Sequence, residues 1–243
     1  MKVYKNIIFD LFDTLILFKP ELLPEITVNG SLRHSTGPDV YLTFQKHYGI
    51  YEINTFYKYF YESYKKFQEL KNIDNREYPN SKRFIIMLDD MKLEYTNDIL
   101  DDLVISHMDS LEKSMIFPEN HMDILNYLAG KSYNLSILSN FDYSPTAHKL
   151  LEKYNINSYF NSILISDEIG WRKPHINTFQ MALEQINNYQ TETVFIGDDL
   201  ERDIKGAFNA GIDSIYINLN NLQNNFNDYN YTVNSLEGIR ELL

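Results

Sequence analysis

The sequence predicts an α/β protein with a doubly wound, parallel-sheet, Rossmann-like core and an inserted all-helical domain. Short apolar runs alternate with amphipathic segments of helix length through the second half of the chain. Residues 12–134 separate the first apolar run from the second, far more than one crossover connection needs. The chain has 243 residues, 44% of them hydrophobic and 23% charged, and can bury a large core. We expect the core at residues 1–18 and 116–243, and the inserted domain at residues 19–115.

The core is expected to contain five strands, each a short apolar run. They are residues 3–11, 135–139, 162–166, 194–197 and 214–219. Segments of helix length lie between these runs or directly before them, at residues 122–133, 144–154, 175–187 and 200–209. Buried strands that alternate with helices are typical of a parallel sheet with helices on both faces. In such sheets, ligands bind beyond the carboxyl ends of the strands.

The inserted segment shows helical periodicity. Four helices are expected, at residues 39–47, 55–70, 81–93 and 96–113. The second has aromatic residues spaced three and four apart, namely Tyr57, Phe60, Tyr61, Tyr64 and Phe67. Such a stripe is more often buried core than ligand pocket, so we expect it to pack inside the inserted domain.

Composition and charge exclude several classes of function. With 22 Lys and Arg against 34 Asp and Glu, the net charge of −12 argues against nonspecific binding to nucleic acid or to an anionic membrane. The absence of cysteine excludes disulfides, thiolate zinc sites, iron–sulfur clusters and a cysteine nucleophile. We see no apolar run of the roughly 18 residues that span a bilayer, and no signal-peptide pattern. We expect a cytoplasmic protein, in which a metal ion would allow a small phosphorylated ligand to bind.

Acidic residues follow two of the predicted strands. Asp10 ends the first strand. Residues 194–196 of a later strand are followed by three more acidic residues, Asp198, Asp199 and Asp203. Mg²⁺ takes a few carboxylates and keeps several waters, so two such strand ends would suit it. Aspartates at strand ends also serve as helix N-caps, which is the simpler interpretation of either cluster alone. The two clusters together favour a metal site.

Two further strand ends carry polar groups. Ser139 and Asn140 follow the second predicted strand, where a hydroxyl and the next backbone N–H groups could hold an anion. Lys173 precedes Pro174 and a predicted helix, where its point charge would suit phosphoryl oxygens. The simpler alternatives are a turn serine and a solvated loop lysine.

In chain order, these segments resemble the four motifs of the haloacid dehalogenase superfamily of hydrolases. The matching segments are Asp10 to Leu15, Ser139-Asn140, Lys173-Pro174, and Gly197 to Gly211. Residues 19–117 match the helical cap that this superfamily inserts after its first strand, so the resemblance covers the whole chain. Ser139 to Asp142 and Gly170 to Pro174 are similar to a subgroup of rhythmically expressed gene products and haloacid dehalogenase-like domain-containing proteins.

The resemblance implies a Mg²⁺-dependent phosphatase that acts on a small phosphorylated metabolite. Asp10 would attack phosphorus and form an aspartyl-phosphate, which water then hydrolyses. Asp10, Asp198 and the main-chain oxygen of Phe12 would bind Mg²⁺. Asp203 would not bind the metal directly, but would orient the metal-bound waters or Lys173. Ser139 and Lys173 would hold the phosphoryl oxygens.

Three further residues complete the expected site, and one position departs from the family pattern. Asp199 is either an outer group of the metal site or a helix N-cap. Thr14 and Asn140 are expected to contact the substrate. Phe12 stands where related phosphatases carry the Asp that protonates the leaving group. Asp13 follows, where those phosphatases usually have Gly. It is the candidate to supply the missing proton, although a shift by one residue turns its side chain in another direction.

The missing acid leaves several functions open. General acids contribute about 10² to 10⁴ in rate, so the chain could be a slow phosphatase, one limited to good leaving groups, or a protein without turnover. An aromatic residue at this position also occurs in metal-independent 2-haloacid dehalogenases. Those enzymes replace the acidic ligands of the fourth motif, whereas Asp198, Asp199 and Asp203 all remain here, which favours Mg²⁺ chemistry on phosphorus. A phosphate-ligand or partner-binding protein is the third alternative. The sequence predicts neither the substrate nor the oligomeric state.

Overall fold

The fold is that of a computed structural model, in which the structure describes residues 2–28, 30–187, 189–219 and 229–243. The chain divides into two compact units. The first consists of Met1–Leu17 together with Phe117–Leu243, and the second is Phe18–Ile116. The chain passes between them along two short strands that pair with each other, β2 (Leu17–Phe18) and β5 (Met115–Ile116).

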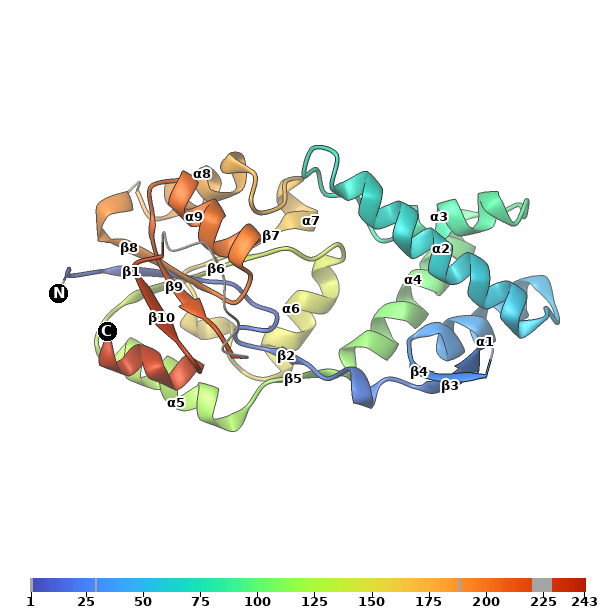
Figure 1. The fold of residues 1–243 in the computed structure, drawn as a ribbon, viewed down its shortest axis with the longest axis horizontal. Coiled ribbons are helices and arrows are strands. Elements are labelled where there is room, and N and C mark those ends of the chain that lie inside the picture. The colour runs from blue at the N-terminus through green and yellow to red at the C-terminus, as the bar shows by residue number, and fades with distance from the viewer. Residues whose placement is uncertain (1, 29, 188, 220–228) are drawn as a thin grey trace. The chain divides into compact units, whose positions relative to one another are not determined.

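A six-stranded parallel sheet forms the centre of the first unit (Figure 1). In spatial order its strands are β10 (Tyr231–Val233), β9 (Asp213–Ile217), β8 (Thr193–Gly197), β1 (Asn6–Phe9), β6 (Asn134–Ser139) and β7 (Ser162–Ile165). The chain fills one half of the sheet from β1 to β7, then returns to fill the other half from β8 onward. This order is doubly wound, and the predicted α/β class is confirmed.

The position of β1 decides where a site can form. All four of its residues are buried, as expected for a central strand covered on both faces. Phe9 pairs in register with Ile137 of β6 on one side and Ile196 of β8 on the other. The carboxyl ends of these three strands therefore lie side by side at one edge of the sheet.

Helices cover both faces of this sheet. They are α5 (Glu119–Gly130), α6 (Ser144–Lys153), α7 (Ser166–Ile169), α8 (Ile176–Gln185) and α9 (Lys205–Asn209), with short turns η2 (Asn157–Tyr159), η3 (Gln190–Glu192) and η5 (Leu236–Glu241). In Figure 1, α8 and α9 lie on one side of the sheet, and α5 and α6 on the other. Right-handed crossovers require this, because the two halves of the sheet are filled in opposite directions.

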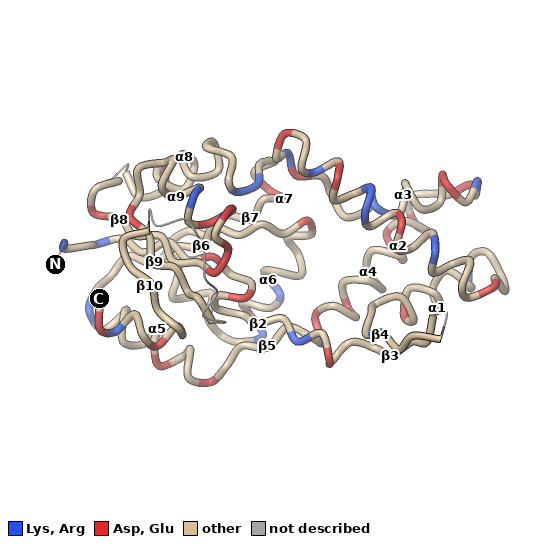
Figure 2. The backbone as a smooth tube through the Cα atoms, viewed as in Figure 1, with Lys and Arg blue, Asp and Glu red and all other residues tan. Residues whose placement is uncertain are grey.

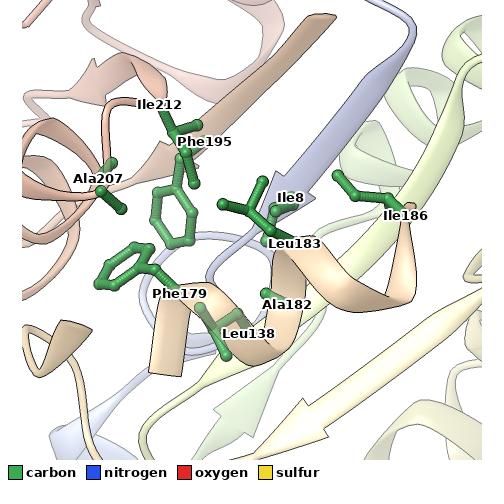
Figure 3. Packing of buried hydrophobic residues seen from close by; sticks show 10 residues of the cluster. Ile8, Leu138, Phe179, Ala182, Leu183, Ile186, Phe195, Ala207 and Ile212 are labelled. Atoms are coloured by element: carbon green, nitrogen blue, oxygen red, sulfur yellow. The ribbon is translucent and has the colours of Figure 1, made fainter. Parts of the chain in front are cut away.

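Helix α8 shows how the core is built (Figure 3). Phe179, Ala182 and Leu183 share one face of the helix and are buried. They pack with strand residues that include Ile8, and with Phe195, whose ring centroid lies 5.5 Å from that of Phe179. The apolar stripe in the sequence thus docks the helix onto the sheet.

Some elements of the first unit differ from the prediction. Residues 200–209 form a π-helical turn, η4 (Leu200–Ile204), followed by α9, in place of one α-helix. The cause is local: the amide of Ile204 bonds back five residues to the carbonyl of Asp199. The edge strand β10, which is only three residues long, was not predicted.

The second unit is mainly helical. Its helices are α1 (Gly37–Tyr48), α2 (Ile53–Lys71), α3 (Ser81–Asp90) and α4 (Asn97–Glu112), after a short turn η1 (Pro20–Leu22). It also contains an antiparallel hairpin that was not predicted, β3 (Glu25–Val28) and β4 (Ser31–His34). Gly30, in the left-handed region at φ 76°, lies in its turn. Within the described ranges, no helix has both the length and the apolarity that a membrane span requires.

The aromatic stripe of α2 is core only in part. Tyr57, Phe60 and Phe67 are buried, but Tyr61 and Tyr64 are 48% and 45% exposed. The buried residues of α2 are Phe56, Tyr57, Phe60, Ser63, Phe67 and Lys71. The prediction was wrong at Tyr61 and Tyr64, because a tyrosine looks apolar by residue type although its hydroxyl end can face water.

The core of the second unit holds a histidine that is expected to make stability depend on pH. His107 Nε2 lies 3.3 Å from a guanidinium nitrogen of Arg83, which can only donate, so the proton resides on Nδ1 and is donated to Thr36 Oγ1 at 2.7 Å. Burial, and then the charge of Arg83, lowers the pKa of His107 well below its ordinary value of 6.5. Protonation therefore favours the unfolded chain.

We expect this unit to lose stability as the pH falls below about 6.5, by at most about 1.4 kcal/mol per pH unit from this one group. Thermal melts between pH 5.5 and 7.5 check this. His107→Gln should flatten the dependence, whereas His148→Gln, on a partly exposed histidine that pairs with Glu168 on the first unit, should not. A slope unaffected by His107→Gln would contradict the assignment.

Candidate active site

Three carboxylates converge at the edge of the sheet where β1 and β8 end. Asp10, Asp198 and Asp203 each offer an oxygen atom, and these oxygens lie within 4.8 Å of one another. The amide of Asp10 donates to the carbonyl of Ile196, which continues the pairing of β1 with β8 past the last strand residue. In Figure 2, acidic segments gather beside the labels β6 and α9.

Gly197 makes room for Asp203. A Cβ atom at Gly197 would lie 2.4 Å from a carboxylate oxygen of Asp203, closer than atoms can approach. The same Asp203 oxygen, Oδ2, accepts the amide of Asp199 at 3.1 Å. A glycine at the end of β8 therefore lets Asp203 fold back over the strand end and reach the other two carboxylates.

Lys173 is the buried cation of the cluster. Its Nζ lies 2.7 Å from Asp10 Oδ1 and 2.6 Å from Asp203 Oδ1. Burial opposes a charge here, but Asp10 and Asp203 outweigh it and raise the pKa of Lys173 above its ordinary value. The lysine stays charged and bridges the nucleophile candidate to Asp203.

Three carboxylates against one lysine leave an excess of negative charge. Burial, and then the charge of Asp10, raises the pKa of Asp198 to about 8. Burial is also the main cause that raises the pKa of Asp203 to about 7, against the opposing effect of Lys173. Crowded carboxylate oxygens that resist ionisation are the donor set a hard divalent cation satisfies. The residues present therefore fit Mg²⁺.

Asn140 and Thr14 hold other site residues in place. The Asn140 amide clamps the Lys173 peptide from both sides: Nδ2 donates to the Lys173 carbonyl at 2.9 Å, and Oδ1 accepts the Lys173 amide at 2.8 Å. The Thr14 hydroxyl donates to Asp198 Oδ1 at 3.3 Å and is buried. Both were expected to contact substrate, and the structure shows contacts that orient Lys173 and Asp198.

Ser139 ends β6 and is buried, with a hydroxyl that has no hydrogen-bond partner among the described residues. A buried hydroxyl without a partner is costly, so a ligand oxygen would stabilise it. Ser139 is not among the residues that line the pocket of this site. That pocket has a volume of about 120 Å³ and is lined by Asp10, Phe12, Asp13, Asn140, Lys173, Asp198, Asp199, Arg202 and Asp203.

The comparison with known protein families agrees with this geometry. The family of haloacid dehalogenase-like hydrolases matches residues 7–217. This chain belongs to that family. The match includes both segments of the sheet unit that carry the carboxylates, together with the whole inserted unit.

Relatives in the haloacid dehalogenase-like family include phosphatases. The glyceraldehyde 3-phosphate phosphatase of Methanothermobacter thermautotrophicus is 32% identical over 102 residues, which are 42% of this chain and 44% of that protein. The pyrimidine 5'-nucleotidase PynA of Streptococcus pneumoniae is 28% identical over 226 residues, 91% of this chain and 86% of that protein. The alignment with the first of these therefore spans less than half of the relative.

The fold is also that of solved structures. The putative HAD-hydrolase YfnB from Bacillus subtilis, solved bound to magnesium, superposes with a TM-score of 0.64 at 22% identity. The match covers 100% of this chain and 99% of that one. At this identity the likeness shows the fold alone.

Phe12 and Asp13 both line the pocket. The Phe12 ring lies on the pocket wall, 4.6 Å from the ring of Phe141 between centroids. Asp13 is exposed, lines the pocket, and has a φ of 60°. Asp tolerates this left-handed backbone better than most residues, which explains how it stands where the resemblance expects Gly.

Asp199 and Arg202 form a pair at the pocket. Asp199 Oδ1 accepts the amides of Glu201 and Arg202, at 3.0 and 2.7 Å, and so caps η4. Its Oδ2 lies 2.8 Å from Arg202 Nε. The structure thus gives Asp199 the N-cap role that the sequence left open. Sequence reasoning missed Arg202; its spacing of three residues from Asp199 was the available signal.

Proposed function

We propose that this chain is a Mg²⁺-dependent phosphatase that hydrolyses small phosphorylated metabolites with Asp10 as nucleophile. The observation that carries the proposal is the buried Asp10, paired with Lys173 and beside Asp198, in one pocket. A nucleophilic carboxylate, a fixed cation for phosphoryl oxygens and a fitting set of cation ligands are the parts that phosphoryl transfer needs.

The reaction proceeds in two displacements. An Asp10 carboxylate oxygen attacks phosphorus, the bond from phosphorus to the leaving oxygen breaks, and that oxygen takes up a proton. A water then attacks the phosphorus of the aspartyl-phosphate, the bond to Asp10 breaks, and inorganic phosphate leaves while the water's proton passes to solvent. Lys173 Nζ and the Ser139 hydroxyl stabilise the phosphoryl oxygens as charge develops.

Mg²⁺ would be held by Asp10, Asp198 and the main-chain oxygen of Phe12. When bound, the ion neutralises charge between the carboxylates and the phosphoryl group. Asp203 positions Lys173, since one of its oxygens pairs with that lysine and the other accepts a backbone amide.

Two considerations support phosphatase activity over dehalogenase activity. Relatives across different stretches of the chain carry phosphatase and nucleotidase names. The second consideration is electrostatic. Asp198 and Asp203 crowd Asp10 with negative charge that Lys173 offsets only in part, and a bound cation would neutralise the remainder. The substrate class is therefore a phosphomonoester.

The test is phosphate release from a panel of sugar, nucleotide and aryl phosphates, with Mg²⁺ and with excess chelator, beside chloride release from 2-chloropropionate. We expect Mg²⁺-dependent phosphate release above the background of an Asp10→Asn variant. Chloride release that chelator leaves unchanged would support the dehalogenase alternative. No turnover above that background on any substrate would support a binding protein.

The absence of an acid at Phe12 leads to a second prediction about this activity. Because it supplies no proton, the wild type should hydrolyse aryl phosphates, whose leaving groups need little protonation, faster than alkyl phosphates by up to about 10² to 10⁴ in kcat/KM. Phe12→Asp should narrow that gap by accelerating the alkyl esters. Phe12→Asn opens the same space without an acid and serves as the matched control. Equal efficiency on both ester types in the wild type would mean that Asp13 or another group already donates the proton.

A further inference from the structure

Arg202 lies on the wall of the same pocket as the carboxylate cluster. Its side chain is 53% exposed, and its Nε is held 2.8 Å from Asp199 Oδ2. Asp199 is itself fixed, since its other oxygen caps η4. Among the described residues, only Asp199 pairs with the guanidinium, which leaves both terminal amino groups available to a ligand.

The charges that line the pocket give the two cations different tasks. Lys173 is buried and bonded to Asp10 and Asp203, so it serves the phosphoryl group. Arg202 is the other cation among the described residues that line the pocket, and it is held at an exposed position. A substrate whose phosphoryl group lies against Asp10 and Lys173 has its remaining atoms toward solvent, where Arg202 is accessible.

We infer that Arg202 is a specificity residue that binds a carboxylate on the leaving group of the substrate. This inference rests on the proposed phosphatase function. The planar guanidinium group can bind a carboxylate through two parallel hydrogen bonds. The bond from Nε to Asp199 leaves the terminal amino groups as donors for such a pair. The single negative charge of a carboxylate matches Arg202, the pocket cation that does not serve the phosphoryl group. A more highly charged group would be repelled by the five carboxylates that line the pocket.

The experiment compares two isosteric esters, carboxyphenyl phosphate and carbamoylphenyl phosphate, each as the meta and para isomer. Both have aryl leaving groups, so Phe12 limits neither. We expect wild type to prefer a carboxylate ester over its amide by about three- to tenfold in kcat/KM, mainly through KM, because a partly exposed ion pair contributes modestly and binds substrate and transition state alike. Arg202→Gln should bring this ratio close to one, and Arg202→Lys should restore part of it.

Lys205→Gln is the matched control. It removes one positive charge three residues away on the following helix, from a lysine that pairs with Glu201 and does not line the pocket. This variant should keep the wild-type ratio. Because each ratio compares two esters in one protein, a general loss of stability or of active enzyme cancels.

The outcomes distinguish a wrong role for Arg202 from a wrong phosphatase assignment. If neither ester is turned over above the Asp10→Asn background, the proposed function is wrong and the role of Arg202 is wrong with it. If both are turned over and the wild type shows no preference at either isomer, or Arg202→Gln leaves the preference unchanged, the phosphatase stands and the role of Arg202 is overturned. In that case Arg202 serves only the pair with Asp199.

Discussion

Asp10→Asn is expected to reduce phosphatase turnover by at least about 10⁴-fold, because an amide oxygen is a poor nucleophile while its shape is nearly that of a carboxylate. The fold should persist, since the amide of Asp10 still bonds to Ile196 and the new side chain can still accept from Lys173. Steady-state phosphate release measures the loss. Acid quench of wild type with ³²P-labelled substrate should trap label on Asp10, and the variant should trap none.

The matched control for this change is Asp123→Asn, the same substitution at an exposed position of α5 in the same unit. It should retain wild-type turnover. Mass spectrometry must exclude deamidation of the new asparagine, which would regenerate the nucleophile. An intact Asp10→Asn protein with wild-type turnover would contradict the mechanism.

Asp198→Asn is expected to have two effects of opposite sign. It should reduce Mg²⁺-dependent turnover by at least about 10²-fold, because it removes a charged ligand of the ion. It should also raise the melting temperature of the metal-free protein, because it relieves repulsion among Asp10, Asp198 and Asp203. Wild type should gain melting temperature on addition of Mg²⁺, and the variant should lose most of that gain.

Asp199→Asn separates the metal site from the helix cap. Asn caps a helix about as well as Asp, so η4 should hold and the Mg²⁺-dependent gain in melting temperature should persist. If instead Asp199→Asn abolishes the gain and Asp198→Asn does not, the two neighbouring aspartates have been assigned to the wrong roles.

The raised pKa values predict how metal-free stability depends on pH. Asp198 and Asp203 have an ordinary pKa of 3.8, raised to about 8 and about 7 in the folded protein. Between about pH 4 and 8 the folded state therefore binds more protons than the unfolded state, and stability falls as the pH rises through this window. Mg²⁺ should reduce that fall, and Asp198→Asn should flatten it in chelator.

Much of the fold and the centre of the site followed from the sequence. The apolar runs identify the strands because a strand buried on both faces tolerates few polar residues. Once the sheet is parallel, residues that follow neighbouring strands must meet at one edge, which is why Asp10 and Asp198 could be placed together from their positions alone. The hairpin of the second unit was not predicted, and Tyr61 and Tyr64 of α2 were wrongly predicted to be buried. Residue type does not show which side of an element is covered by neighbouring segments.

The sequence by itself placed Asp10, Asp198, Asp203 and Lys173 at one site; the tertiary structure alone added Arg202 and decided which contacts each residue makes. Asp199 and Asp203 are the same residue type four positions apart, yet one caps a helix and the other bonds to Lys173, because a π-helical turn and the missing side chain of Gly197 set their directions. Asn140 and Arg202 likewise gained their contacts from the folded backbone. A side chain's partner depends on angles and on atoms distant in the chain, whereas its place at a strand end depends only on local pattern.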